Sequence, residues 1–178
     1  PAELEKERKV ILEEIKGVED TPDDYIHELF INTVWPDHPL GRPILGTRET
    51  IKALTHKDIL AYIEQYYSPR EIVISVAGNF EHGRLIELLN AHFGALTRTG
   101  IPKQEATPAF THAIAVKKKQ LEQVQVCLGC KGINYTHEDR FVISALNGVL
   151  GSSMSSRLFQ EVREQNALAY SIYSYLAS

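Results

Sequence analysis

The sequence lacks the features that would define several protein classes at once. Among 178 residues only two are cysteine, which argues against a disulfide framework. No apolar run approaches the length of a membrane span, and no secretory signal is visible. The net charge is −4, so the chain has no basic excess of the kind that attracts nucleic acid.

The composition that remains is that of a folded, water-soluble chain. Hydrophobic residues make up 43% and charged residues 24%, as in ordinary globular proteins. The length is enough for one domain, or for two small or incomplete ones. Because the chain begins at Pro1 and not at methionine, we expect it to be a fragment of a longer protein.

The first stretch, residues 3–18, predicts an amphipathic helix with two acids on its apolar side. At about 100° per residue, one face collects Leu4, Ile11, Ile15 and Val18, with Val10 at the edge. Glu7 and Glu14 fall on that face, almost two turns apart. A buried carboxylate is costly without a compensating group. Either these acids lie at the solvated edge of the face, paired with water or lysine, or a cation meets them.

The other charged residues of this helix are predicted to lie on opposite or flanking, solvated faces. They are Glu5, Lys6, Arg8, Lys9, Glu13 and Lys16.

Residues 154–175 (MSSRLFQEVREQNALAYSIYSY) contain a second pair of candidate site residues. Arg163 and Tyr170 stand seven residues apart, and both can donate hydrogen bonds to peptide carbonyls or to a developing oxyanion. The structural alternative is that Arg163 pairs with Glu161 or Glu164, and that Tyr170 packs in a strand.

Apolar periodicity and turn residues predict helices alternating with strands along the rest of the chain. The expected helices are 22–33, 47–53, 55–67, 81–93, 136–150 and 155–165, and the expected strands are 71–78, 112–116, 123–130 and 168–176. Three prolines and a glycine predict a loop at 35–43. Cys127 and Cys130 form a C-x-x-C, which could be a redox pair or half of a zinc site. Because no second pair follows, two structural thiols on a strand are favoured.

Three of these segments resemble the pitrilysin-type zinc peptidases, the family of mitochondrial processing peptidase, insulysin and the bacterial processing proteases. Glu7 to Glu14 is similar to the family's E-R-x-x-x-x-x-E helix, residues 38–46 to its H-P-x-G-R-x-x-x-G segment, and residues 154–175 to its S-S-R-L-F signature. One departure is Asn166-Ala167, where a Lys/Arg-Gly pair is common.

The family's H-x-x-E-H motif is absent. None of the seven histidines (27, 38, 56, 82, 92, 112 and 137) belongs to that motif or to H-E-x-x-H. The resemblance therefore implies a fragment that lacks two zinc ligands and the general base.

For the fold, the resemblance implies an α+β class with two-layer α/β domains of the processing-peptidase type, in which helices pack on one face of an antiparallel-rich sheet. Residues 1–96 would be the C-terminal part of the zinc-binding first domain. Residues 97–108 would be a linker, and residues 109–178 the N-terminal part of a second, substrate-gripping domain.

For function, the resemblance implies a zinc-dependent endopeptidase that hydrolyses peptides or unfolded, presequence-like segments. Glu14 would be the third zinc ligand and Glu7 a supporting catalytic acid, while Arg163 and Tyr170 would bind the substrate. The intact enzyme would hold one Zn²⁺, which this fragment would not retain, so the fragment alone would be inactive. The alternative is a non-catalytic partner or core-type subunit of the same fold.

The expected partners are a peptide substrate and a related subunit in a homodimer or heterodimer, without nucleic acid or a membrane span. The expected location is the bacterial cytoplasm, with the mitochondrial matrix as the alternative.

Overall fold

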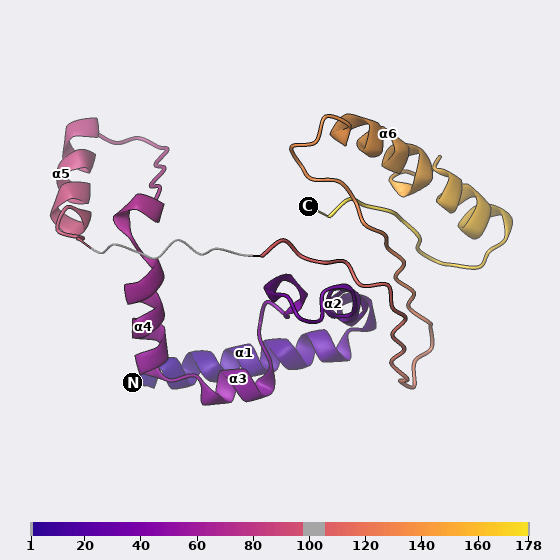
Figure 1. Ribbon diagram of the computed structural model, residues 1–178, viewed down its shortest axis with the longest axis horizontal. Helices are drawn as coiled ribbons and strands as arrows, with labels where there is room; N and C mark the ends of the chain where they lie inside the picture. The colour runs from indigo at the N-terminus through magenta and orange to yellow at the C-terminus, as the bar shows by residue number, and fades with distance from the viewer. Residues whose placement is uncertain (1, 98–105, 178) are drawn as a thin grey trace. The chain divides into compact units, whose positions relative to one another are not determined.

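The computed structural model describes residues 2–97 and 106–177 (Figure 1). Its elements are the α-helices α1 (Ala2–Asp20), α2 (Pro22–Val34), α3 (Arg48–Ala53), α4 (His56–Tyr66), α5 (His82–Phe93) and α6 (Arg140–Gly151), the 3₁₀ turns η1 (Pro39–Gly41) and η2 (Pro69–Glu71), and the π-helix η3 (Phe159–Gln165). The chain divides into two compact units, Pro1–Cys127 and Leu128–Ser178. None of the described helices combines the length and apolar character of a membrane span.

The predicted helices are confirmed in approximate place, but the one predicted over residues 155–165 is a π-helix over Phe159–Gln165. Local hydrogen bonds explain two of their starts: Thr47 with Thr50, and Thr55 with Asp58, form reciprocal capping boxes at α3 and α4. The helix predicted from residue 136 begins at Arg140 instead, because the backbone and hydroxyl of Thr136 both donate to the Asn134 side chain in a preceding turn. A side chain that bonds its own turn competes with helix formation.

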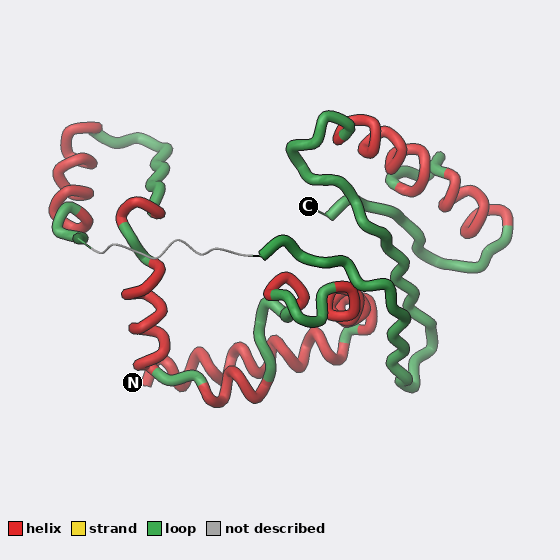
Figure 2. Tube along the Cα trace, viewed as in Figure 1, coloured by secondary structure: helices red, strands yellow, loops and turns green. Residues whose placement is uncertain are grey.

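The predicted α+β fold class is wrong for the part of the chain that the structure describes. No strand occurs in residues 2–97 or 106–177, and every segment between helices is a loop or turn (Figure 2). The four predicted strands have strand-like composition, but a strand exists only where a neighbouring segment completes its hydrogen-bonded ladder. Their apolar side chains are correspondingly uncovered: Val73 is 90% exposed, Ile114 94% and Val124 87%.

Helix α1 packs against both α2 and α3 (Figure 1). Ile15 of α1 and Val34 of α2 are the buried apolar side chains of this arrangement, at 7% and 3% exposure. Of the apolar face predicted for α1, Leu4, Ile11 and Val18 are half-buried, whereas Val10 is exposed. The amphipathic pattern therefore identified the packing side, with Ile15 at its centre.

Two guanidinium groups attach α3 to α1. The prediction that Arg8 lies on a solvated face is wrong, because its side chain is only 15% exposed. It donates to the carbonyls of Ile51 and Leu54 at the end of α3, where free carbonyls and the helix dipole favour a cation. At the start of α3, Arg48 donates to Glu19 of α1 through Nε and through Nη2, the latter at 2.6 Å.

The loop at 35–43 follows the predicted break and contains the short turn η1. Gly41 is buried, and a Cβ built on it would lie 2.0 Å from the carbonyl oxygen of Trp35. The Nδ1 of His38 accepts a bond from the backbone N–H of Leu40, and its Nε2 bonds the carbonyl of Ala106 at 2.8 Å. The loop is thus held by close backbone contacts, which require glycine at position 41.

In the second unit, Ser174 attaches the segment after η3 to α6. The backbone N–H of Ser174 donates to the carbonyl of Gly151 at 3.0 Å, and its hydroxyl donates to Asn147 at 2.8 Å. A Cβ on Gly151 would lie 2.6 Å from the Ser174 nitrogen. Glycine therefore permits this approach.

Two glycine-to-alanine substitutions should change stability in opposite directions. Gly41→Ala should lower the free energy of unfolding by about 1–3 kcal/mol, because its methyl group overlaps the Trp35 carbonyl. Gly17→Ala should raise it by about 0.5–1 kcal/mol, because Gly17 lies in α1 with nothing within 4 Å of its Cβ position. Urea unfolding of the two variants measures both effects. Changes of the same sign in both variants would contradict this account.

The Arg48–Glu19 pair should make stability depend on pH. Hydrogen bonding to Arg48 lowers the pKa of Glu19 from its usual 4.5, so the stabilisation is present above that pH and is lost as pH falls through the lowered pKa. The stability difference between the protein and its Arg48→Gln variant should therefore shrink on acidification from neutral pH to about pH 2. Arg84→Gln, which breaks an exposed pair within α5, is the control for loss of an arginine. A difference that persists in acid would refute the assignment.

Candidate functional site

Glu7 and Glu14 lie on α1 with their side chains exposed. Neither side-chain carboxylate forms an ion pair or hydrogen bond with another described residue. Val10, between them along the helix, is 50% exposed. The two carboxylates thus lie at the open edge of the apolar face, beside the side of α1 that α2 and α3 cover. Both carboxylates are therefore accessible to water or to a cation.

The residues described here do not complete a zinc site. Zinc in a peptidase takes three protein ligands and a water. No group of three or more His, Cys, Asp or Glu converges for a metal ion anywhere in residues 2–97 or 106–177. Glu14 has the right donor chemistry for one ligand, but the described part of the chain brings no second or third ligand to it.

Arg163 and Tyr170 lie close together in the second unit. The guanidinium carbon of Arg163 lies 5.6 Å from the ring centroid of Tyr170 and 4.6 Å from that of Phe159, within cation–π range. The Nε of Arg163 lies 3.9 Å from a carboxylate oxygen of Glu164, and an exposed ion pair at this distance contributes little to stability. Tyr170 is 83% exposed and lies in a loop. Both side chains therefore present donors to solvent.

The turn between these two residues has an unusual backbone. Ala167 has a φ of +49°, in the left-handed region where glycine is usual after a helix. The backbone N–H of Ala167 donates to the Arg163 carbonyl at 3.1 Å, and that of Leu168 to the Val162 carbonyl at 2.9 Å. The Asn166 amide adds a bond to the Glu161 carbonyl at 2.6 Å. Ala167 thus adopts a left-handed conformation in the turn between Arg163 and Tyr170, whose side chains lie close together.

The two pairs belong to different units, Glu7 and Glu14 to the first and Arg163 and Tyr170 to the second.

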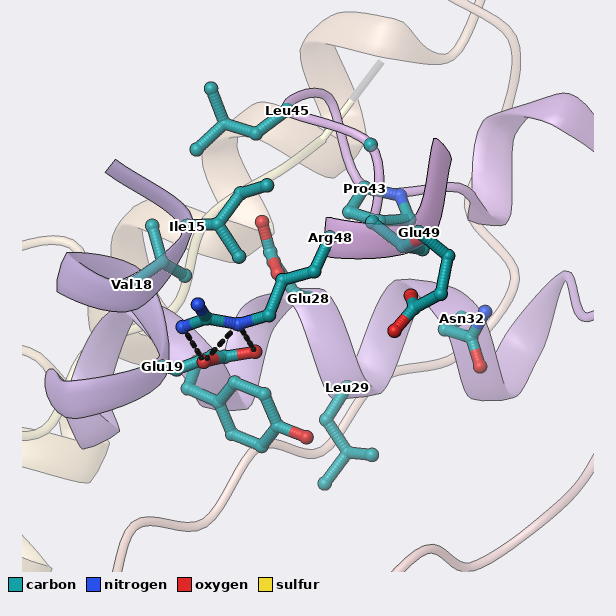
Figure 3. Close-up of a pocket in the computed structure, with 13 residues that line it drawn as sticks. Ile15, Val18, Glu19, Glu28, Leu29, Asn32, Pro43, Leu45, Arg48 and Glu49 are labelled. Carbon is teal, nitrogen blue, oxygen red and sulfur yellow. Dashed lines mark hydrogen bonds and ion pairs between the residues drawn. The ribbon is translucent and has the colours of Figure 1, made fainter. Parts of the chain in front are cut away.

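Sequence reasoning missed a pocket of about 310 Å³ in the first unit (Figure 3). It is formed by α1, by one face of α2, and by the segment from Pro43 to the start of α3. Its lining residues are Ile15, Val18, Glu19, Tyr25, Glu28, Leu29, Asn32, Pro43, Leu45, Gly46, Thr47, Arg48 and Glu49. The signal was present in α2, where Tyr25, Leu29 and Asn32 follow a helical spacing that includes Glu28.

The three carboxylates of this pocket differ in their pKa shifts and in their partners. Burial, with a smaller contribution from the charge of Glu19, raises the pKa of Glu28 above 4.5. Bonds from its own backbone N–H and from Thr47 lower the pKa of Glu49. Glu19 is engaged by Arg48. Glu28 is therefore the carboxylate that the pocket leaves uncompensated.

Cys127 and Cys130 are free thiols. Cys127 is half-buried, and burial raises the pKa of its thiol. A raised pKa lowers the thiolate fraction, which fits a structural thiol better than a reactive one.

Known proteins resemble this chain along nearly its whole length. It is 44% identical over 176 residues to the uncharacterized zinc protease YmxG of Bacillus subtilis, covering 99% of this chain and 43% of that protein. It is 37% identical over 179 residues to an uncharacterized zinc protease of Mycobacterium leprae, covering 98% of this chain and 40% of that protein. The chain thus spans about two fifths of the length of these curated relatives.

A solved structure shares its fold. The crystal structure of a peptidase M16 inactive domain from Pseudomonas fluorescens matches with a TM-score of 0.73 at 18% identity, over 99% of this chain and 44% of that one. The family model for the peptidase M16 inactive domain matches residues 53–178. Since that range is more than half of the sequence, the chain belongs to the peptidase M16 family.

Proposed function

We propose that this chain is part of a zinc-dependent endopeptidase in which Glu14 supplies one zinc ligand and Glu7 a supporting acid. The observation that carries the proposal is the state of these two acids: both are exposed on one line of α1 and unpaired within the described chain. The names of the curated relatives, which are zinc proteases, support the same reaction class.

The rigidity of α1 suits different roles for the two acids. Seven residues of helix separate their Cα atoms by about 10 Å. A zinc–carboxylate bond is only about 2.0–2.2 Å long. One acid as ligand and the other as a group that orients or electrostatically supports the site fits this spacing better than two ligands to one ion.

Arg163 and Tyr170 are proposed to bind the peptide backbone of the substrate. The stacking of Arg163 on Phe159 and Tyr170 orients the guanidinium while its N–H groups stay available. The exposed Tyr170 offers a hydroxyl beside them. Donors prepared in this way can hold peptide carbonyls and oppose charge that develops on the carbonyl oxygen.

A specific observation favours a second candidate, a non-catalytic subunit or domain. Residues 53–178 match a domain described as inactive, and this range includes Arg163 and Tyr170 but not Glu7 or Glu14. In that case the second unit would bind polypeptide without cleaving it. The proposed partners are a peptide substrate and a related subunit, and the proposed location is the bacterial cytoplasm, in line with the bacterial relatives.

Substitution of Glu14 tests the ligand assignment in the full-length protein that contains this chain. Glu14→Gln should lower zinc affinity and cleavage of an unfolded peptide by about 100-fold or more, because an amide is a poor substitute for a carboxylate ligand. Glu7→Gln should lower activity by about 10–100-fold with zinc retained. Metal analysis and a peptide-cleavage assay measure the two effects.

Glu13→Gln is the matched control, since it removes a neighbouring exposed carboxylate of α1. If the full-length protein bound no zinc and cut no peptide, the peptidase proposal would fail and the non-catalytic subunit would replace it.

Removal of the Tyr170 hydroxyl tests substrate binding. Tyr170→Phe and Arg163→Gln should each lower kcat/KM for peptide cleavage by about tenfold or more, because the first removes a hydroxyl donor and the second the guanidinium charge. Zinc content should stay unchanged. Tyr175→Phe is the control, since it removes a hydroxyl from the same C-terminal segment. Unchanged kcat/KM in both variants would leave Arg163 and Tyr170 with a packing role only.

A further inference from the structure

The C-terminal end of η3 is closed by backbone hydrogen bonds, two of which meet at one carbonyl. The Arg163 carbonyl accepts from the backbone N–H of Asn166 and, at 3.1 Å, from that of Ala167. The bond from Ala167 spans four residues, as in the αL cap of helices. The N–H of Leu168 donates to the Val162 carbonyl at 2.9 Å, one residue further back than in a Schellman motif, because a π-helix has a wider turn than an α-helix. The backbone of Arg163 is therefore part of this turn.

Ala167 holds a conformation that its residue type disfavours. Its φ of +49° lies in the left-handed region, where a Cβ crowds the backbone and glycine bears no such cost. Asn166 and Ala167 are both exposed, so burial in a core does not impose this conformation. A disfavoured backbone conformation persists only where neighbouring contacts fix it. Contacts of the adjacent residues must therefore hold Ala167.

The Asn166 side chain makes such a contact. Its amide donates to the Glu161 carbonyl at 2.6 Å. This carbonyl lies five residues back along the chain, which is the acceptor position of a π-helix. Because the backbone N–H of Asn166 also donates to Arg163, Asn166 is tied to the last turn of η3 at two points. This double attachment restricts the direction in which the chain leaves the helix.

Tyr170 lies three residues beyond Ala167. Its ring centroid is 5.6 Å from the guanidinium carbon of Arg163, although Tyr170 is 83% exposed and is not held by packing in a core. Phe159, the other ring at this guanidinium, belongs to η3 itself, so the helix sets its place. The place of Tyr170 instead depends on the course of the chain after the turn.

We propose that Asn166 is a positioning residue for Arg163 and Tyr170. By holding Ala167 in the left-handed conformation, its amide directs the chain so that the Tyr170 phenol lies beside the guanidinium. This role rests on the proposed function of the pair, which is to bind the peptide backbone of the substrate. Asn166 itself would touch no substrate and would act only through the turn.

Ring-current shifts measure the positioning without any assay of activity. In ¹H–¹⁵N spectra of the full chain, the Arg163 Nε–H resonance is shifted by the rings near the guanidinium, and Tyr170→Leu gives the part due to Tyr170. Asn166→Ala should remove most of that part. Asn166→Ala/Ala167→Gly should restore it, because glycine adopts the left-handed conformation unaided.

Gln165→Ala is the matched control, since it removes an exposed amide one residue before Asn166, and it should leave the Arg163 resonance in place. The backbone amides in the same spectra report whether each variant is folded. An unshifted Arg163 resonance in folded Asn166→Ala would refute the proposal.

Peptide cleavage by the full-length protein that contains this chain tests the role in the reaction. Asn166→Ala should lower kcat/KM by about five- to tenfold, the fold-change that corresponds to one hydrogen bond, with zinc content unchanged. Adding Ala167→Gly should return kcat/KM to within about threefold of the parent value. In a Tyr170→Phe background, Asn166→Ala should cost no more than about twofold, because the hydroxyl that it positions is gone. A loss of equal size in both backgrounds would indicate a general structural role and overturn the proposal.

The two measurements separate failure of this proposal from failure of the proposed function. If the full-length protein cuts no peptide, the peptidase function fails, and the Arg163 resonance still decides whether Asn166 positions Tyr170. If Asn166→Ala leaves both the resonance and kcat/KM unchanged, the peptidase function stands and Asn166 is only a helix cap.

Discussion

Two arginines hold helix α3 along helix α1, and the arrangement of the first unit depends on them. Arg8 occupies the carbonyl end of α3, and Arg48 ties the start of α3 to Glu19. Arg8 satisfies terminal carbonyls that a short helix cannot satisfy alone, and Arg48 pairs with a side-chain carboxylate of α1. Because α2 and α3 cover one side of α1, the edge that carries Glu7 and Glu14 stays open. The Arg48–Glu19 contact also forms part of the lining of the pocket between α1, α2 and the start of α3.

Arg8 belongs to a sequence motif and also makes a structural contact. The sequence places it beside Glu7 in the segment that resembles the zinc-peptidase helix. In the fold its side chain is directed to the carbonyls of Ile51 and Leu54. A motif can therefore contain a residue that positions the helix together with residues that carry the proposed chemistry.

Large apolar side chains remain uncovered in several loops of the described chain. Ile114, Val124 and Leu128 are each more than four-fifths exposed, and the buried apolar side chains are few. Soluble proteins rarely leave such surface without a partner. The matched curated relatives are more than twice as long as this chain, and their extra length is consistent with a need for further contacts.

The sequence by itself determined the helices, because apolar spacing and capping side chains act over a few residues. Ile15 at the centre of the α1 face and the Thr55–Asp58 cap are examples. The sequence also indicated the family, through the segments around Glu14 and Arg163. Only the tertiary structure decided that residues 71–78 and 112–116 are not strands, since a ladder needs a partner that local pattern cannot supply. Tertiary contacts likewise buried Arg8, stacked Tyr170 on Arg163 and left Glu28 without a counterion. These three arrangements depend on residues distant in the chain or on a turn conformation, and residue type alone specifies neither.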